Sequence, residues 1–473
     1  MRILLLLAGV LLLQATSLGT AAADGGPTGQ DQSFAQSLGD RELTVIVRRV
    51  ETIPGPLRVD VVTHRGTPPG TLTLALVPRD AADNLSAPGQ ATAHANVQLG
   101  PRPDLYGATL RVDRPGPWEL ELSDGRRTAR IPFALPAKVI PPAERVAYGG
   151  FVAAGGCLLC ALFAATRGRR AGVAMVATGG MIAAIAVAVT GALLSPTIRP
   201  PAAPGSETDA TLANTRAPYA PVPRGDLARP PVNIQVQAPR ATIGRRTEMR
   251  LLLTDGATGR PVDDLLPHHG ALMHLVVISP AGQMSHLHPI RVAAGEYRVE
   301  LTPYDAGRFA VSVELARRGG GTQLIRPTGF TVAGPAQPPQ TPEPPGTRTV
   351  DGTKLTITTD RLAAGSATTI TVTVDAALQL WLGMQGHLIV AGPVTGSGFD
   401  QVPVWLHGHA MAPGPVTANP PDETVAAFGP EVRFTTTFPY PGRYHLWIQV
   451  ERDFAVLTVP LVLDVPLANG EQR

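Results

Sequence analysis

The sequence of 473 residues predicts a mainly β protein, with three β-sandwich domains plus a transmembrane α-helical hairpin. Most of the chain consists of short alternating runs, such as LTVIVRRV and TTITVTVDA, punctuated by glycine, proline and aspartate. Such runs are typical of antiparallel sandwiches, because alternate residues of a strand share one face. Two uninterrupted apolar runs are instead long enough to cross a bilayer as helices.

The N-terminus has the composition of a secretory signal peptide over residues 1–23. Arg2 precedes an apolar run, and small residues then lead to the stretch Ala21-Ala22-Ala23. The apolar run is too short to cross a bilayer, so export and cleavage are expected. Residues 24–40 are rich in Gly, Gln, Ser and Asp, and we expect them to form a flexible segment.

Three β-rich segments follow, at 41–136, 231–333 and 347–467, and each has the size of one immunoglobulin-like β-sandwich of about 100 residues. An aromatic residue, a strand, a glycine, a second aromatic residue and a second strand recur near the end of each segment. This repeat predicts a hairpin that packs aromatic side chains inward. The segments 196–230 and 334–346 are proline-rich, and we expect them to act as semi-rigid linkers.

Residues 146–166 and 171–194 are the two apolar runs, and both are long enough to be transmembrane helices. The connection at 167–170 carries three arginines, which predicts a cytoplasmic basic turn. The chain is therefore expected to be an integral protein of the cell membrane, with its domains on the extracytoplasmic side. Glycines in the two runs predict a closely packed hairpin, namely Gly149, Gly150, Gly155, Gly156, Gly172, Gly179 and Gly180.

Cysteine usage and charge exclude several kinds of site. Cys157 and Cys160 are the only cysteines, and both lie in the first apolar run. The favoured interpretation is that they are small apolar residues at a helix interface, with a redox or metal role as the alternative. The β-rich segments therefore have no disulfide and no cysteine-ligated metal. The net charge of +3 comes without a basic stripe, so we expect no nucleic-acid site.

The histidines follow a repeated pattern in the second and third segments, which hold nine of the eleven. MHLVVISP in the second aligns with GHLIVAGP in the third, and a His-x-His motif follows each. Alternate residues of a strand share a face, so each copy predicts a metal site. The candidate ligands are His274, Met284, His286 and His288 in the first copy, and His387, His407, His409 and Met411 in the second.

Imidazole and thioether, without thiolate or carboxylate, favour copper as the bound ion, and methionine favours the cuprous state. Zinc is less favoured and would use the histidines alone. The ordinary alternative is that the histidines only form hydrogen bonds and the methionines fill the core. Pro289 and Pro413 also place both motifs near strand ends, where the alternation weakens. The remaining histidines are interpreted as loop, structural or solvated residues, namely His64, His94, His268, His269 and His445.

The block HHGALMHLVVISPAGQMSHLHP, with the glycine-aromatic ending of each segment, resembles the YtkA-like and FixH-like envelope domains. The resemblance covers 231–467 and extends more weakly to 41–136. It implies an immunoglobulin-like fold and an association with copper handling. The sequence VPVWLHGHAM in the third segment departs from the His-Leu-His-Pro ending, which implies that the two sites differ in affinity.

The sequence thus favours a membrane-anchored extracytoplasmic protein that binds or traffics copper, with copper-handling or envelope proteins as partners. The alternative is a non-metal envelope interaction or assembly protein whose histidines are structural. An enzyme is least favoured, because the β-rich segments lack the cysteine that blue-copper and binuclear electron-transfer centres use. The sequence has no GxSxG elbow in strand-helix context and no HExxH helix, and it leaves a type-2 copper oxygenase open.

Overall fold

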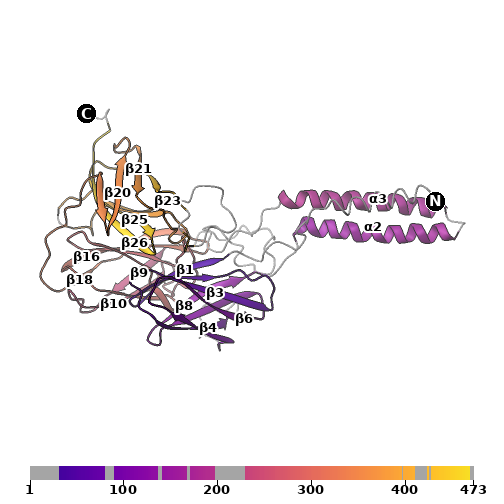
Figure 1. Cartoon of the computed structure of the whole chain (residues 1–473), viewed down its shortest axis with the longest axis horizontal. Coiled ribbons are helices and arrows are strands. Elements are labelled where there is room, and N and C mark those ends of the chain that lie inside the picture. Colours follow the sequence, from indigo (N-terminus) through magenta and orange to yellow (C-terminus); the bar gives the residue numbers. More distant parts are fainter. Residues whose placement is uncertain are drawn as a thin grey trace. The chain divides into compact units, whose positions relative to one another are not determined.

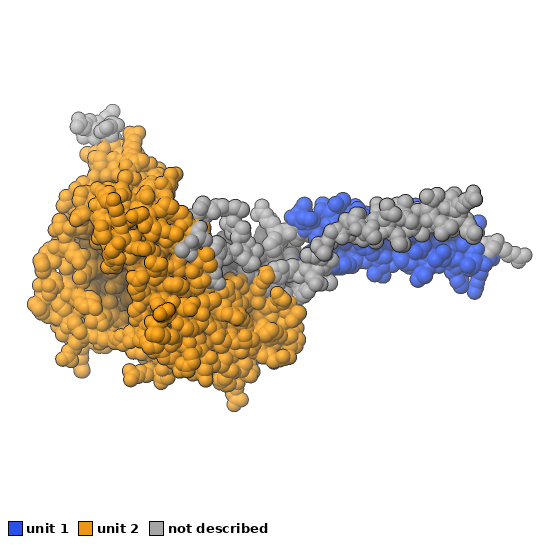
Figure 2. All heavy atoms as spheres, viewed as in Figure 1, with its two compact units in different colours: residues 1–28, 136–202, 214–221 blue, residues 29–135, 203–213, 222–473 orange. Residues whose placement is uncertain are grey.

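The computed structural model describes residues 31–79, 90–136, 141–167, 171–197, 230–396, 398–410, 423–425 and 428–468. Four sequence predictions lie wholly or mostly outside these residues, namely the signal peptide at 1–23, the basic turn at 167–170, the linker at 196–230 and the ligand Met411. The described residues form a helical unit and a β unit, which Figure 2 shows in blue and orange.

The helical unit consists of α2, Pro142–Thr166, and α3, Ala171–Leu194, followed by a 3-10 turn at Ser195–Thr197. The two helices lie side by side (Figure 1). Proline is favoured in the first turn of a helix, where its missing N–H needs no partner, so α2 begins four residues before the apolar run. Both helices are long and apolar enough to cross a membrane.

The two helices approach closely at Gly150 and Gly191. A Cβ atom at Gly150 would lie 2.8 Å from the carbonyl oxygen of Ala184, and one at Gly191 would lie 2.8 Å from that of Ala143. Gly191 was not among the predicted contact glycines. Five of the predicted ones meet nothing within 4 Å, because neighbouring helix positions are about 100° apart. These are Gly149, Gly155, Gly156, Gly172 and Gly179.

The first sandwich has two antiparallel sheets with the strand orders β1-β2-β3-β6 and β5-β4-β7-β8. Its strands are β1 Gln32–Leu38, β2 Arg41–Val47, β3 Gly55–Thr63, β4 Gly70–Pro78, β5 Ala93–Leu99, β6 Leu105–Val112, β7 Gly116–Ser123 and β8 Thr128–Leu135. Strand β1 corrects the expectation that 24–40 is flexible throughout. Phe34 and Leu38 are fully buried there, and they secure a strand that is otherwise polar in sequence.

The second sandwich has the sheets β14-β15-β10-β9 and β11-β16-β12-β13, with β17 and β18 also paired to β16. Its strands are β9 Val232–Gln237, β10 Thr247–Asp255, β11 Leu265–Leu266, β12 His274–Ile278, β13 Met284–Leu287, β14 Ile290–Ala293, β15 Glu296–Leu301, β16 Gly307–Arg317, β17 Gly321–Ile325 and β18 Phe330–Val332.

The third sandwich has the sheets β19-β20-β21-β24 and β23-β22-β25-β26. Its strands are β19 Thr347–Val350, β20 Thr353–Thr359, β21 Ala367–Val374, β22 Gly386–Gly392, β23 Val404–Ala410, β24 Glu431–Thr437, β25 Gly442–Arg452 and β26 Ala455–Val465. The structure therefore confirms the predicted fold class: three immunoglobulin-like β-sandwiches and two apolar helices that pair as a hairpin.

The second and third sandwiches pack against each other through the outer faces of two sheets. Leu275 and Val277 of β12 point into the core of their own sandwich. Val276, between them, instead joins a separate apolar cluster with Ile389 of β22 and Trp447 of β25. Strands β12 and β22 are consequently buried on both faces. The continuous apolar runs in their sequences reflect that burial.

The first sandwich contacts the second through a buried ionic network. The guanidinium of Arg291 on β14 donates to Glu119 of β7 at 2.8 Å and to Asp263 at 2.7 Å. Arg79 adds a further hydrogen bond to Asp263 at 3.0 Å. Arg291 and Glu119 are each only 4 % exposed, so the contact depends on these charges satisfying one another.

The first sandwich also contacts the third, through His64. Nδ1 of His64 lies 2.8 Å from the carboxylate of Glu451, and Glu423 is buried nearby. Burial alone would lower the pKa of His64, but the hydrogen bond to Glu451 and the charges of Glu451, Glu423 and Glu42 together outweigh it and raise the pKa from 6.5 to about 9. Burial, together with the charge of Glu451, raises the pKa of Glu423 to about 7.

This contact predicts a pH dependence of stability. A raised histidine pKa means that the stabilisation by His64 is complete below about pH 6.5 and is lost as the pH rises through about 9. The difference in unfolding temperature between wild type and His64→Gln should therefore be larger at about pH 6 than at about pH 10. Thermal unfolding of the full chain in detergent measures it, and a difference that does not change with pH would contradict the ion pair.

Candidate metal centre

Three histidines of the second sandwich come together on the outer face of the β12–β13 sheet. His274 begins β12, His286 lies on β13 and His288 follows the last residue of β13. Leu275 pairs with Leu287 across these strands, which places His274 beside His288. One ring nitrogen from each of the three histidines lies within 4.8 Å of the other two. We call these residues the first triad.

The third sandwich repeats this arrangement with His387 on β22 and with His407 and His409 on β23. His387 pairs directly with His409, and His407 lies two residues along the same strand, on the same face. Their ring nitrogens also lie within 4.8 Å of one another. We call these residues the second triad. The repeated sequence pattern thus corresponds to a repeated cluster of side chains.

The two triads form one cluster of six imidazoles. The sequence suggested one separate site in each domain, but the packing of the two outer faces brings the sites together. The ring centre of His407 lies 4.9 Å from that of His274 and 4.9 Å from that of His286. Within its own triad, the same ring lies 5.5 Å from His387. The closest contacts between the triads are therefore only about as long as the 4.8 Å between His286 and His288 and slightly longer than the 4.4 Å between His407 and His409.

Four of the six histidines donate one ring N–H to an acceptor that fixes the orientation of the ring. Metal-binding histidines usually make such a hydrogen bond, which leaves the other nitrogen free to coordinate. The four pairs are His274 Nε2 with the carbonyl oxygen of His268 at 3.0 Å, His286 Nδ1 with Gln449 at 2.8 Å, His288 Nδ1 with Glu42 at 2.7 Å and His407 Nδ1 with Glu314 at 3.1 Å.

Two of these hydrogen bonds cross reciprocally between the sandwiches. His286 of the second sandwich uses Gln449 on β25 of the third, while His407 of the third uses Glu314 on β16 of the second. Each acceptor lies opposite the first histidine of its own triad in the strand register. Equivalent residues that exchange partners are typical of a two-fold relation between repeated domains.

The nitrogens left over are buried and lack hydrogen-bond partners among the described residues. They are Nε2 of His288, His407 and His409 and both ring nitrogens of His387. His387 is 0 % exposed, so bulk water does not hydrogen-bond to its ring nitrogens. A buried polar atom without a partner costs about 1–3 kcal/mol. Several such atoms in one cluster indicate a site for a ligand that accepts nitrogen lone pairs.

The contact between His274 and His286 points to a metal ion in particular. Nδ1 of His274 lies 3.2 Å from Nε2 of His286. Each neutral ring donates its single N–H from the opposite nitrogen to a different acceptor, so two lone pairs face each other across this distance. Two imidazole nitrogens bound to one tetrahedral ion at 2.0–2.1 Å would lie about 3.3 Å apart. An ion bound by both lone pairs would remove their repulsion.

The electrostatics of the cluster keep the imidazoles in the neutral form that coordinates metals. Burial, followed by neighbouring histidines, holds the pKa of His274, His286 and His387 well below the usual 6.5. The same two causes lower the pKa of His409 to about 2. The lone pairs of these rings are therefore available at neutral pH without deprotonation.

A third group lies beside the second triad and consists of His268, His269 and Glu314. The ring centre of His269 is 3.9 Å from that of His409. Burial alone would raise the pKa of Glu314, but hydrogen bonds from His268 and His407 outweigh it and lower that pKa. The loop interpretation of the two histidines is therefore incomplete, because their loop reaches the edge of the cluster.

Met284 occupies different surroundings from those predicted. Met284 lies on the same strand face as His286, but its side chain packs against the apolar cluster between the sandwiches. Met411 lies outside the described residues. Trp381 occupies the sequence position that corresponds to His268, and its ring centre lies 4.7 Å from that of His387. The described part of the cluster is thus built on imidazoles, with an aromatic wall.

Sequence reasoning did not find the acceptors Glu42, Glu314 and Gln449, because no local motif marks them. Glu42 belongs to the first sandwich, and the other two lie on strands far from the histidines in sequence. The fully apolar character of HLVVI and HLIVAG was the available signal. In an antiparallel sheet, such a run indicates that both faces are covered, and hence that another domain packs there.

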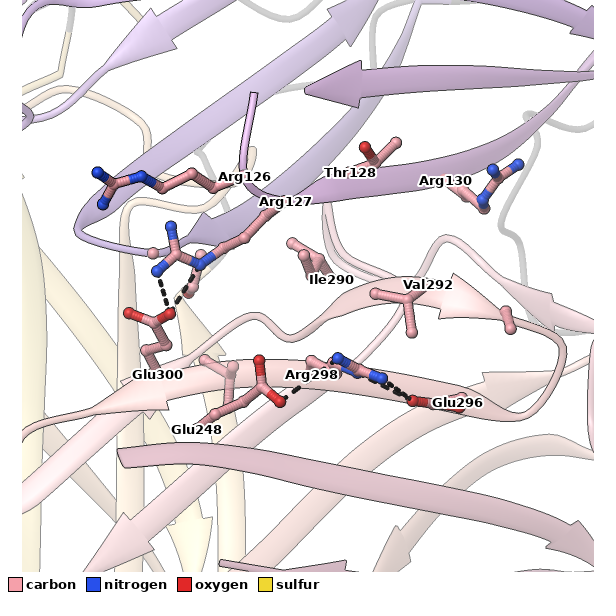
Figure 3. Close-up of a pocket in the computed structure, with 14 residues that line it drawn as sticks. Arg126, Arg127, Thr128, Arg130, Glu248, Ile290, Val292, Glu296, Arg298 and Glu300 are labelled. Atoms are coloured by element: carbon pink, nitrogen blue, oxygen red, sulfur yellow. Dashed lines mark hydrogen bonds and ion pairs between the residues drawn. The ribbon is translucent and has the colours of Figure 1, made fainter. Parts of the chain in front are cut away.

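A concave region lies between the first and second sandwiches (Figure 3). It is lined by Arg127 and Arg130 on one side and by Glu296, Arg298 and Glu300 on the other. Arg127 donates to Glu300, and Arg298 donates to Glu296 at 2.9 Å. These charges satisfy each other, so the region gives no indication of a ligand.

Comparisons with known proteins give one family match. The model of a family described as a "Domain of unknown function (DUF8832)" matches residues 231–333 and, again, residues 348–466. The model therefore matches twice, once over each sandwich that carries a histidine triad. No curated protein matches the chain.

Solved structures that match the chain at low sequence identity include two adhesion proteins and a putative membrane anchored protein. The Escherichia coli adhesin FdeC is 12% identical, with 93% of this chain and 99% of that chain covered and a TM-score of 0.17. A tetra-tandem repeat of a large adhesion protein is 11% identical, with 94% of each chain covered and a TM-score of 0.17. A putative membrane anchored protein from Corynebacterium diphtheriae is 8% identical, with 93% and 95% covered and a TM-score of 0.16. Such likeness concerns the fold alone.

Proposed function

We propose that this chain is a membrane-anchored extracytoplasmic protein that binds copper through the two histidine triads. The observation that carries the proposal is the convergence of six imidazoles, four of them oriented by acceptors, with buried nitrogen lone pairs left over. Imidazole suits copper and zinc far better than magnesium or calcium. Without a methionine ligand among the described residues, the cuprous preference rests on the sequence motif alone.

Membrane anchoring is the second part of the proposal. It is supported by α2 and α3, both long and apolar enough to span a bilayer, and by their close packing at Gly150 and Gly191. The arginines of the connection and the signal-peptide composition favour an extracytoplasmic position for the β unit. Copper bound there is outside the cytoplasm, which suits a role in holding the ion or passing it to envelope proteins.

Metal titration of the full chain in detergent tests the proposal. Wild type should bind about two copper ions per chain in competition with a chelator, one for each triad. His286→Ala/His288→Ala should lower this number to at most about one, because a single imidazole remains in the first triad. His94→Ala is the matched control, since His94 is exposed on β5 and should not affect binding.

The full chain is required because Glu42 of the first sandwich orients His288. A parallel titration with zinc distinguishes the two ions that suit imidazole. Failure of wild type to compete with even a weak chelator for either ion would sink the metal proposal. The histidines would then be structural, and the envelope interaction protein would be the better account.

A further inference from the structure

We propose that the two triads form a single binuclear centre, in which two copper ions share one solvent-derived bridging ligand. This inference rests on the proposed function, because it needs copper to bind at the triads. It goes further in two respects. The ions are magnetically coupled rather than independent, and the second and third sandwiches build the centre jointly.

The rings of the two triads are close enough to belong to one centre. The ring of His286 lies 4.9 Å from that of His407 and 5.7 Å from that of His387, both in the other triad. Within its own triad, it lies 4.8 Å from His288 and 5.4 Å from His274. At these spacings the rings of the two triads are direct neighbours, so an ion in one triad has the ligands of the other close by.

The number of ligands in each triad leaves room for a shared ligand. Each triad offers three imidazoles, and an ion with three protein ligands keeps an open position for solvent. Because both triads belong to one buried cluster, one water-derived ligand can fill the open position of both ions. Two-metal sites with such a shared ligand usually hold their ions about 3.5–4 Å apart.

The charge of two buried cupric ions favours a bridging anion. Two cupric ions would bring about four positive charges into a region where His274, His288 and His387 are at most 1 % exposed. The described carboxylates that contact the triads are Glu314 and Glu42, one at each triad. A bridging hydroxide between the ions would reduce their mutual repulsion where water cannot screen it.

Reciprocal orientation carries the last step. The sandwich that provides His286 depends on Gln449 of the other sandwich to hold that ring, and His407 depends equally on Glu314. Loss of one such acceptor typically lowers metal affinity about 10–100-fold. Neither triad is therefore complete without the other domain, and binding of the two ions is expected to be linked.

Electron paramagnetic resonance of the full chain loaded with cupric ions in detergent, with its total copper and its cuprous copper both measured in parallel, tests the inference. Wild type should hold about two cupric ions per chain but show well under half of the corresponding spin, because bridged cupric ions couple. His286→Ala/His288→Ala should hold about one ion and show the full spin of that ion. The double variant should therefore bind less copper than wild type but give a stronger resonance signal per bound copper ion.

A second variant keeps the test independent of ligand loss. Gln449→Met keeps all six imidazoles but removes the acceptor of His286 and the hydrogen bond from Gln449 to Thr458, so it should raise the fraction of detectable spin. Two ions with full spin in wild type would overturn the binuclear centre and leave the copper-binding function intact. Absence of bound copper would overturn both, so the two failures are distinguishable.

Discussion

Replacing Arg291 by methionine should destabilise the β unit by about 3–5 kcal/mol, the usual cost of removing one partner from a buried ion pair. Arg291 donates to Glu119 at 2.8 Å and to Asp263 at 2.7 Å, in surroundings where it is 4 % exposed. Burial alone would lower the pKa of Arg291, but Asp263 outweighs it and raises that pKa. Without the guanidinium, two buried carboxylates would keep only Arg79 and Arg130 as partners.

Arg443→Met is the matched control for this prediction. Arg443 pairs with Asp464 through two hydrogen bonds of 2.8 Å, but the two side chains are 58% and 65% exposed. Exposed pairs contribute at most about 1 kcal/mol, because water screens them. Urea unfolding of the full chain in detergent compares the two variants. Equal losses of stability would show that the Arg291 network does not hold the first sandwich in place.

Replacing Trp447 by alanine should cost about 3–5 kcal/mol, as expected for the loss of a buried tryptophan. Trp447 is 2 % exposed and packs with Val276 and Ile389 between the second and third sandwiches. This apolar cluster holds the outer faces of the two sandwiches in contact, and the triads lie on those faces. The variant should therefore also weaken copper binding, although no ligand changes. Calorimetric unfolding and the copper titration measure the two effects on one preparation.

Tyr440→Ala is the control for Trp447→Ala, because Tyr440 also belongs to the third sandwich but is 52 % exposed. It should change stability by less than about 1 kcal/mol and leave copper binding unchanged. If Trp447→Ala lost stability but bound copper as tightly as wild type, the triads would not depend on the packing between the sandwiches.

The alternation of apolar and polar residues and the length of the apolar runs were sufficient to predict three sandwiches and a helical hairpin. Both patterns depend only on which side chains are buried within one element. Strand β1 was missed because QSFAQSL is polar in composition, although Phe34, Ala35 and Leu38 are buried in it. The contact glycine Gly191 was missed because the sequence does not specify the rotation of one helix against the other.

The histidine triads were predicted from a local rule, the shared face of alternate strand residues. Their union in one cluster was not predicted, because it depends on how two domains pack. The acceptors Glu314 and Gln449 illustrate the difference. Each lies opposite a histidine of its own sandwich in the register, yet each binds a histidine of the other sandwich. No sequence spacing encodes such a contact.

Anomalous scattering at the copper edge, from crystals of the copper-loaded full chain, tests the central claim most directly. The account predicts two copper peaks between the second and third sandwiches. One should lie among His274, His286 and His288, and the other among His387, His407 and His409, with a single light-atom bridge between them. Copper found only at other residues, or no ordered copper in crystals that contain the metal, would contradict it.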